Sequence, residues 1–582
     1  MPAVPSKLWS IHELLELIFS QLNGRSLARV ACVCRLWSDI ALDFLWHDVD
    51  DLYKLLGLLA SFKRPEPANM LRGNNRYYSF RNSLQPSDWL RFQRYSRRVR
   101  RLTHDQLSGK SRGKLLSSNA LEEIVRTCPY PEIIPNLQSF SWYSGGLDRQ
   151  EKSLVFIHSK IKHLSLQLHA SPELASYIHQ VATRASRLEH LEFRLSEAMQ
   201  DTERDLIPLL PSFQALQRIT LPIYGLTSGI FVALSRMRHL KTIALSAPTE
   251  SGNGDRSDVM TFSPTLAPTS FPALRRISFS AQIAHATRLL SGAFAPSSLA
   301  YIYLHCLVVS DADEVQRLFE VVSQRCDGLV ELSVDFIIGP GSPLRVPAPA
   351  MEARPDLRTF YPLFSAKRLA RFEFRWDYPL SLTDEDMRMF ALEWPALETL
   401  VLNPEPVLEH ARPTLTLASL AVFASHCPRL RKLGLYLDAT AAPSPRDFAR
   451  PIVPFAQLET LLVGVSPIKE TEPVALFLSQ LCPLGCALSS GLRWPDAFGI
   501  ALDHAGILDD RRLRLTEHWV RWNDVAKVLP LATKARQQER TRMETLQRDL
   551  EAMTLSWDRE RQRSEELEQE VHGWRNRVGS RR

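Results

Sequence analysis

Residues that could carry out chemistry are scattered along this chain instead of being gathered in motifs. Two cysteine pairs stand close together, Cys32 with Cys34 and Cys482 with Cys486, but neither has a second Cys or His pair at zinc-binding spacing. The sequence has no GxSxG, no HExxH, no phosphate-binding glycine loop and no dinucleotide fingerprint. We therefore predict no catalytic, cofactor-binding or metal-binding residues and expect a protein that is not an enzyme.

Two charged runs need an interpretation. Thr383 stands directly before Asp384, Glu385 and Asp386, an order that caps a helix and stabilises its positive end, so we favour a helix start over a metal site. A basic run holds Arg97, Arg98, Arg100 and Arg101, alternating with Val99 and Leu102. We interpret it as the solvated face of one element, with a site for phosphate or an acidic partner as the alternative.

Composition excludes several classes of protein. The 582 residues are 45% hydrophobic and 23% charged, which is typical of a globular protein, and the length requires several domains or an elongated array. The net charge of +7 is spread along the chain, so no nucleic-acid partner is expected. No apolar run approaches the ~18 residues of a membrane span, so no membrane partner is expected either. The first ten residues do not resemble a secretory leader, so we expect a reducing compartment, the cytoplasm or the nucleus.

The first fifty residues have the pattern of three short amphipathic helices. Apolar residues recur at helical spacing on one face: Ile11, Leu14, Leu15, Ile18, Phe19 and Leu22. Ser10 and Glu13 could cap the start of this helix, and Asn23 with Gly24 could end it. A second helix is predicted from Ser26 and a third at Phe44 to Trp46. Fifty residues are too few to bury all these apolar side chains. A partner or the next domain must therefore cover those that stay exposed.

The order of these residues resembles the F-box family. ELLELIFSQL (Glu13 to Leu22) is similar to its first half, and SLARVACVCRLWSDIA (Ser26 to Ala41) to its second half, with the Val-Cys-Arg-Leu-Trp order; Ile11 and His12 stand where the family has a proline. The resemblance implies binding of a Skp-type adaptor and, through it, a cullin. The implied adaptor-binding residues are Leu14, Leu15, Ile18, Phe19, Leu22, Leu27, Val30, Val33 and Trp37. The alternative is a plain helical cap with these residues as its private core.

A pattern Leu-x-x-apolar-x-apolar recurs from residue 131 to 465 and resembles the strand of a leucine-rich repeat. Its twelve copies begin at Leu137, Ile161, Leu188, Leu216, Leu240, Leu274, Leu299, Leu329, Leu369, Leu397, Leu430 and Leu458. Copies lie 24 to 40 residues apart, with amphipathic segments between them that suit helices. Three Pro-rich insertions, Ser246 to Pro272, Gly339 to Pro355 and Asp438 to Pro454, are predicted to be mobile loops.

Side chains between the leucines of such strands point to the inner, concave surface of the array. We predict this set as the candidate substrate face, with ordinary solvated surface as the alternative for each residue taken singly. The set is Tyr143, Glu192, Arg194, Tyr303, His305, Asp335, Glu373, Arg375, Asn403 and Tyr436.

The last hundred residues change character. Trp519, Trp522, Val525 and Leu529 predict a helix that closes the array and stops at Pro530. Beyond it, apolar residues follow spacings of three and four among many charges, up to a break of the heptad near Glu560 and Ser564. A coiled coil, a solitary charged helix and disorder all fit this segment, so self-association through it is one of the alternatives.

The fold class expected from these elements is α/β. The predicted domains are an F-box (1–50), a helical linker and solenoid cap (51–130), an irregular leucine-rich-repeat-like solenoid (131–465), a C-terminal cap (466–530) and a charged helix or coiled coil (531–582). The layout resembles fungal F-box proteins with divergent repeats. It implies a substrate-recognition adaptor of an SCF-type ubiquitin ligase with an unknown protein substrate; the alternative is a repeat scaffold without a ubiquitin-ligase role.

Overall fold

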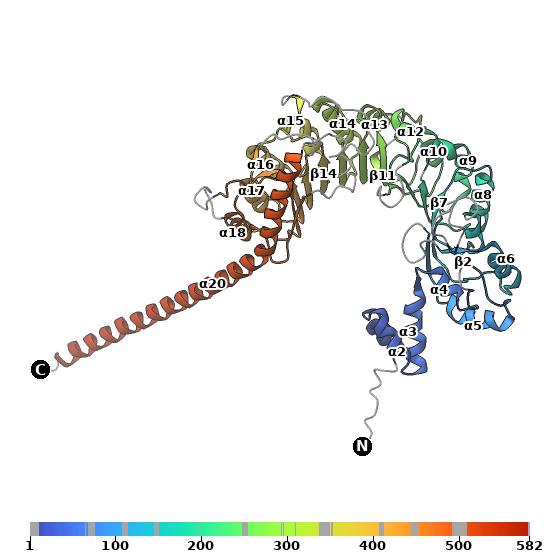
Figure 1. The fold of residues 1–582 in the computed structure, drawn as a ribbon. Coiled ribbons are helices and arrows are strands. Elements are labelled where there is room, and N and C mark those ends of the chain that lie inside the picture. The colour runs from blue at the N-terminus through green and yellow to red at the C-terminus, as the bar shows by residue number, and fades with distance from the viewer. Residues whose placement is uncertain are drawn as a thin grey trace, which may run out of the picture. The chain divides into compact units, whose positions relative to one another are not determined.

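The computed structural model of the protein describes most of residues 11–579. The residues left out in this range are 64–65, 68–75, 107–113, 145–149, 196, 247–253, 293, 295, 309, 337–349, 351–352, 377, 407–412, 444–451 and 492–508. The chain divides into two compact units; the main body of the first ends at Leu369, and the second begins at Ala370. Each unit is built on parallel strands with helices along one side (Figure 1).

Three helices open the first unit: α1 (His12–Ser20), α2 (Gly24–Val30) and α3 (Arg35–His47). The prediction of three short helices is confirmed, but their boundaries differ. The helix expected from Ser26 is interrupted because Cys34 adopts an extended conformation, with φ −156° and ψ 168°, and serves as the N-cap of α3. As a result, the Phe44 to Trp46 cluster is the end of α3 and not a helix of its own.

The predicted ends of α1 are wrong. Its N-cap residue is Ile11, with no side-chain cap bond, and Ser10 lies outside the described residues. Asn23 does not end α1 but begins α2, because its extended backbone lets Oδ1 accept a hydrogen bond from the Ser26 N–H at 3.0 Å.

A sheet of parallel strands follows the three helices in the first unit, each strand pairing with the next along the chain. The strands are β1 (Asp48–Val49), β4 (Arg101–Asp105), β6 (Ser139–Tyr143), β7 (His163–Leu168), β8 (His190–Leu195), β9 (Arg218–Leu221), β10 (Thr242–Leu245), β11 (Arg276–Ala281), β12 (Tyr301–Cys306) and β13 (Glu331–Asp335). The helices that cover it are α6 (Ser118–Thr127), α8 (Leu174–Arg184), α9 (Gln200–Leu206), α10 (Ser228–Ser235), α12 (Ser257–Met260), α13 (Ile283–Ser291), α14 (Ala312–Arg325) and α15 (Leu357–Phe360).

The predicted leucine pattern coincides with these strands. Phe140, Leu164, Leu191 and Ile219 lie side by side in register on β6 to β9 and are buried beneath the helices. Each strand therefore adds one layer to a continuous apolar core, which a single repeat could not form alone. Parallel strands on one side, helices on the other and stacked leucines between them are the architecture of a leucine-rich-repeat solenoid (Figure 1).

Smaller elements stand at the beginning of the first unit. Helices α4 (Leu52–Leu56) and α5 (Pro86–Ser96) precede β4, and a second small sheet contains β2 (Glu66–Pro67), β3 (Arg76–Tyr78) and β5 (Lys114–Leu116). The short 3-10 helices η3 (Glu151–Val155), η4 (Leu210–Ser212), η5 (Pro296–Ser298) and η7 (Tyr361–Ser365) connect repeats.

The insertion from Ser246 to Pro272 is only in part the mobile loop that its composition predicts. Residues 247–253 lie outside the described residues, but Val259, Phe262 and Phe271 are buried. The Phe262 ring lies 5.6 Å from that of Phe231, and Asp258 accepts a hydrogen bond from the Met199 N–H at 2.7 Å. The prediction failed because three apolar anchors outweigh the local excess of Pro and Ser. Residues 337–349 and 444–451 of the other two insertions also lie outside the described residues.

The second unit continues the same repeat plan. Its parallel strands are β14 (Arg371–Arg375), β15 (Thr399–Leu402), β17 (Lys432–Leu435), β19 (Thr460–Gly464) and β20 (Ala487–Ser490), with β16 (Leu415–Thr416) paired separately to β18 (Leu437–Asp438). Helices α16 (Asp384–Glu393), α17 (Ala418–His426) and α18 (Thr471–Leu481) cover the sheet. The acidic run begins α16 as predicted, because Thr383 and Asp386 form a reciprocal capping box.

The last helix, α20 (Asp509–Gly579), packs against α18 and closes the second unit. Trp522, Val525 and Leu529 are buried as predicted, and the Trp522 indole donates a hydrogen bond to the Ser466 carbonyl at 2.8 Å. The predicted stop at Pro530 is wrong. The buried stripe continues to Thr533 while Pro530 itself is exposed, so packing on both sides holds the helix across a residue that costs ~3 kcal/mol in a helix interior.

Among the strands of the long parallel sheets, β1, β4 and β20 lie outside the predicted pattern. In β4 the third apolar position of the pattern is taken by His104, which is buried in register with Trp142, with ring centroids 4.2 Å apart. The His104 Nε2 accepts a hydrogen bond from the Gln106 amide at 3.0 Å, and its Nδ1 has no partner among the described residues. Burial lowers the pKa of His104 to about 4, so the imidazole is neutral in the folded protein at pH 7.

This buried imidazole should make the first unit sensitive to acid. Because the folded pKa lies below the unfolded value of 6.5, the unfolded chain binds the proton first, and stability falls as pH drops from about 6.5 to about 4. At the lower end of this pH range the loss of folding stability amounts to roughly 3 kcal/mol. His104→Phe keeps an aromatic ring against Trp142. It should reduce the difference between the urea-unfolding midpoints measured at pH 7 and at pH 5. An unchanged pH dependence in the variant would contradict a buried neutral His104.

The basic run is not the uniformly solvated face that its alternation predicts. The Arg98 side chain is only 5% exposed and forms ion pairs with two aspartates of α3, with Asp39 at 2.7 Å and with Asp43. It also donates to the Asp39 carbonyl at 2.8 Å and the Arg94 carbonyl at 3.1 Å. Arg98 therefore fixes α3 to the segment that leads into β4. The alternation of basic and apolar residues had predicted that this side chain faces solvent.

Replacing Arg98 and replacing its two aspartate partners should lower the stability of the protein by unequal amounts. Asp39→Ala with Asp43→Ala leaves a buried guanidinium without its counter-charges, which costs about 3–5 kcal/mol. Arg98→Met leaves two exposed carboxylates that water can solvate. The loss of stability then comes only from the missing hydrogen bonds and amounts to about 1–3 kcal/mol. Native-state hydrogen exchange of the α3 amides measures both, and equal losses would contradict the buried position of Arg98.

Candidate functional site

The three N-terminal helices share one small core. Leu15 and Phe19 of α1, Leu27 of α2 and Ile40 with Ala41 of α3 are buried together. The Phe19 ring meets Trp37 edge-on, with centroids 5.8 Å apart. These side chains hold the helices in a fixed relation, which is what a docking surface needs.

The residues predicted to bind an adaptor take three different places in this bundle. Leu15, Phe19 and Leu27 are buried in the core and can only support a surface. Around the core lie the half-buried members of the set, which are Leu14, Leu22, Val30 and Trp37. Ile18 and Val33 are 42% and 61% exposed and are the members most available to a partner.

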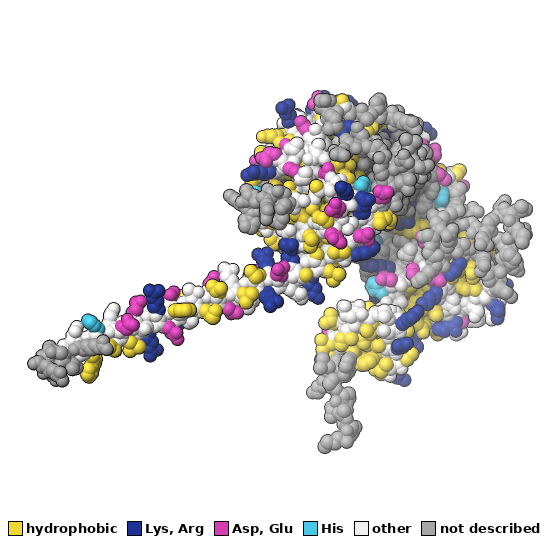
Figure 2. All heavy atoms as spheres, turned by 60° about the vertical axis from the view of Figure 1, so that its left-hand side comes forward, with side chains coloured by type: hydrophobic (Ala, Val, Ile, Leu, Met, Phe, Trp, Pro, Cys, Tyr) yellow, Lys and Arg dark blue, Asp and Glu magenta, His cyan; other side chains and the backbone are white. Residues whose placement is uncertain are grey.

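Other apolar side chains on the same helices are exposed and were not predicted. Leu17 is 66% exposed, and Ile11 and Leu36 are also open to solvent. We call Ile11, Leu17, Ile18, Val33 and Leu36 the apolar flank. Figure 2 shows hydrophobic side chains gathered over the helices next to the N-terminus. Leu17 lies off the helical stripe used for prediction, and the signal that could have found it is an apolar residue on the otherwise polar side of α1.

The C-terminal end of α3 is covered by the protein itself. The Trp46 ring lies 5.2 Å from Tyr95 of α5, and the Arg100 N–H donates to the His47 carbonyl at 2.9 Å. Strand β1, directly after α3, pairs with β4 with Asp48 opposite Arg101. The three helices are thus joined to the first strands of the sheet, while the apolar flank stays open.

The predicted substrate face divides into separate clusters on the inner face of the sheet, the face opposite the helices. In the first cluster the Arg194 guanidinium lies 3.7 Å from the centre of the Tyr143 ring and pairs with Glu192 at 3.2 Å. The Tyr143 hydroxyl donates to Ser165 at 2.8 Å, and burial raises the pKa of this tyrosine. The three predicted residues therefore form one rigid group on β6 and β8.

The second cluster lies on β12 and β13 and is largely buried. Asp335 accepts a hydrogen bond from the Tyr303 hydroxyl at 2.6 Å and contacts His305 Nδ1 at 2.6 Å. Burial, together with the Asp335 carboxylate, raises the pKa of Tyr303 well above its usual value. His305 and Asp335 are nearly inaccessible, so this trio stabilises the inner face more than it offers contacts to a ligand.

The predicted residues of the second unit are also engaged. Glu373 pairs with Lys432 at 2.6 Å, and Arg375 pairs with Glu405 at 3.4 Å. Asn403 is buried with φ 47°, a left-handed conformation that asparagine tolerates, and it bonds the Trp376 N–H and the Tyr378 carbonyl. Its role is to hold the chain after β14. Tyr436 is half-buried beside β17.

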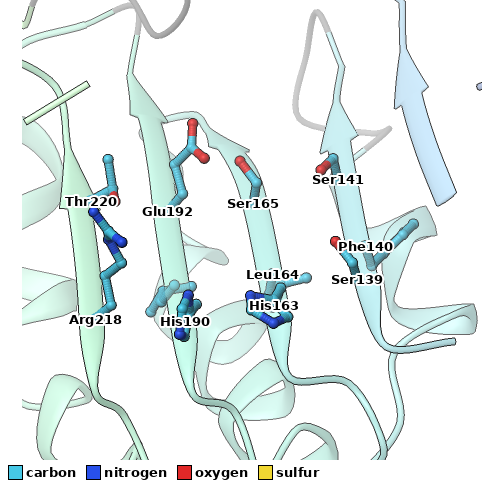
Figure 3. A pocket seen from close by; sticks show the side chains of 11 residues that line it. Ser139, Phe140, Ser141, His163, Leu164, Ser165, His190, Glu192, Arg218 and Thr220 are labelled. Atoms are coloured by element: carbon cyan, nitrogen blue, oxygen red, sulfur yellow. The ribbon is translucent and has the colours of Figure 1, made fainter. Parts of the chain in front are cut away.

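An open hollow of about 270 Å³ lies on the inner face between β6 and β9, as Figure 3 shows. His163 and His190 lie next to each other on β7 and β8 with ring centroids 4.2 Å apart. Arg218 of β9 and Glu192 line the same hollow. Its remaining polar lining consists of hydroxyl groups, from Ser139, Ser141, Ser165 and Thr220.

Both imidazoles in the hollow are neutral at pH 7. Burial lowers the pKa of His163 and of His190, and the neighbouring His163 lowers that of His190 further. A neutral imidazole both donates and accepts hydrogen bonds, so with the hydroxyl groups the hollow can bind polar groups of either kind. His163 and His190 were not predicted because only the residues after the second apolar position of each repeat were considered for the inner face. Both histidines stand directly before that position, and this placement is the signal that could have found them.

Among the described residues, no group of three or more His, Cys, Asp or Glu side chains could hold a metal ion. None of the described helices is long and apolar enough to cross a membrane.

Three of the solved structures that match this chain share little of its sequence. At 14% identity each, they include a TLR13–ssRNA13 complex (TM-score 0.33), covering 71% of this chain, and the leucine-rich repeat-containing protein LegL7 from Legionella pneumophila (TM-score 0.30), covering 49% of this chain and 87% of its own. A complex of Rad7 and Elc1 in yeast has a TM-score of 0.32 at 14% identity and covers 72% of this chain and 87% of that one. The match spans 59% of the length of the TLR13 chain.

Among curated proteins, none matches this chain. A family model described as F-box-like matches residues 12–51, which contain the three N-terminal helices and the whole apolar flank except Ile11. The chain therefore carries an F-box-like domain at residues 12–51, followed by a leucine-rich-repeat solenoid.

Proposed function

We propose that the protein is the substrate-recognition subunit of an SCF-type ubiquitin ligase. In this proposal the F-box-like helices bind a Skp-type adaptor and, through it, a cullin, and the inner face of the solenoid binds a protein target. The chain itself makes or breaks no bond, and its place of action is the cytoplasm, the nucleus or both.

The observation that carries the proposal is the apolar flank. Its five side chains stay exposed although the C-terminal end of α3 is packed against α5. Covering a large apolar side chain gains about 1.5–3 kcal/mol, so a partner that seals this flank would bind through a few such anchors. The match of the same helices to an F-box-like family model supports a Skp-type adaptor as that partner.

The connection between the two parts explains how recognition could lead to modification. Arg98 and the pairing of β1 with β4 join the adaptor-binding helices to the solenoid without a flexible linker. A bound target would be held in a defined region beside the rest of the ligase. Such positioning raises the effective concentration of the target at the conjugating enzyme without any chemistry by the receptor.

The hollow between β6 and β9 is the best candidate for the target contact. The other polar side chains predicted for the inner face are mostly engaged with one another, whereas His163, His190 and Arg218 line an open space. Neutral imidazoles, hydroxyls and one guanidinium suit a polar segment of a protein target more than an apolar one.

The second candidate function is a repeat scaffold without a ubiquitin-ligase role. The long helix α20 favours it, because an extended helix with exposed apolar residues is itself a means of assembly. The two functions differ in what the apolar flank contacts, so adaptor binding separates them.

Charged substitutions in the apolar flank should abolish adaptor binding. Leu17→Asp with Ile18→Asp places two carboxylates in the proposed interface and is expected to weaken binding of a purified Skp-type adaptor on the order of 100-fold or more. Both side chains are exposed, so the fold should be unaffected. Calorimetric titration measures the change.

The control is Leu90→Asp, which introduces one carboxylate at a residue 67% exposed on α5, outside the flank. It should bind the adaptor like the wild type. Full binding by the flank variant, or equal loss in both variants, would contradict the proposed interface and favour the scaffold.

A target held in the hollow should depend on Arg218. Proximity labelling with the Leu17→Asp, Ile18→Asp chain would enrich targets that are bound but not modified. Adding His190→Ala and Arg218→Glu should remove those proteins from the labelled set, whereas Arg187→Glu, an exposed charge reversal outside the hollow, should not. An unchanged labelled set after the hollow substitutions would place the target elsewhere.

A further inference from the structure

The second half of α20 exposes an unusual number of large apolar side chains. Figure 1 shows this part of the helix extending alone beyond α18. The exposed apolar residues there are Met543, Leu546, Leu550, Met553, Leu555, Trp557, Leu567, Val571 and Trp574. Single exposed apolar residues are common, but a row of them along one helix marks an interaction surface.

All but one of these residues follow an unbroken heptad. Counting from Met543, alternating steps of three and four residues pass through positions 546, 550, 553, 557, 560, 564, 567, 571 and 574. Only Glu560 and Ser564 are polar, and the register is the same before and after them. The break suspected from the sequence is therefore two polar layers within one continuous seam, which extends ~48 Å at 1.5 Å per residue.

We infer that this seam is the contact between two copies of the protein, which pair through α20 as a parallel, in-register coiled coil. The inference does not rest on the proposed function of the first unit. A heptad sustained over more than four repeats is the pattern of a coiled coil, in which the a and d residues of each helix fill spaces on the other.

The charges beside the seam favour a second copy in parallel orientation. In a parallel pair a g residue faces the e residue five positions further along the partner, which sets Arg563 opposite the partner's Glu568 and, by symmetry, repeats this attraction. The remaining g and e pairs from Arg542 to Arg561 contain no like charges. A fully overlapping antiparallel pair would instead set Asp549 opposite Glu570 twice, which is repulsive.

The two polar layers hold Glu560 at a d position and Ser564 at an a position. In a parallel in-register pair Glu560 faces the partner's Glu560, a like-charge contact that costs stability, and the partner's Arg561 lies beside each carboxylate and offsets part of this repulsion. Polar residues within a seam reduce stability but fix the register of the two helices. Two copies would carry two F-box-like domains and two inner faces, so the assembly could bind a target with two sites more tightly than a single copy.

Light scattering of the purified full chain tests the pairing. The wild type should have about twice the chain mass of 66.3 kDa, and Leu550→Asp with Met553→Asp should reduce it to the single-chain mass. The matched control, Leu531→Asp with Leu555→Asp, changes two exposed leucines of α20 outside the seam and should remain paired. A single-chain mass for the wild type, or an unchanged mass for the seam variant, would overturn the proposal.

Disulfide cross-linking tests the orientation. Leu550→Cys and Leu567→Cys, each in a chain whose exposed Cys32 and Cys34 are replaced by Ser, should both cross-link with their own copies upon oxidation. An antiparallel pair would leave each variant alone uncross-linked but would join the two when mixed, because residues 550 and 567 then face each other. That result, or no cross-link in any combination, would overturn the parallel in-register pair.

Discussion

Three short helices provide too little volume to bury every large apolar side chain that they carry, and this limit shapes the N-terminal domain. Leu15, Phe19, Leu27 and the start of α3 fill the small core. Other side chains of α3 are covered by α5, and the apolar flank is left at the surface. A surface of this kind is stable in water only at a cost, and for this reason we propose a partner that covers it.

The solenoid buries its apolar side chains by repeating a small unit. Each strand and helix pair is too small for a core of its own, but stacking in register makes one continuous core. This arrangement leaves the inner face free for polar residues. Many of them bind one another, as Asp335 does with Tyr303 and His305, whereas the described strands β6 to β9 leave an open hollow lined by His163, His190 and Arg218.

Local pattern was enough to predict most of the fold but little of the site. In all twelve copies of the pattern the second and third apolar residues lie on a strand, and the first lies two residues before it, since periodic burial is recorded in the sequence itself. Strand β4 was missed because His104 occupies an apolar position, and α20 passes Pro530 because packing outweighs propensity. The burial of Arg98 and the pairing of Tyr303 with Asp335 depend on residues distant in sequence, which no local pattern contains.

The central claim is that the apolar flank is covered by a Skp-type adaptor. Hydrogen–deuterium exchange of the full chain, alone and with a purified adaptor, measures this directly. We expect slower exchange in α1, α2 and the first turn of α3, with no change in β6 to β13. Absence of binding, or protection confined to the solenoid while α1 exchanges as before, would contradict it.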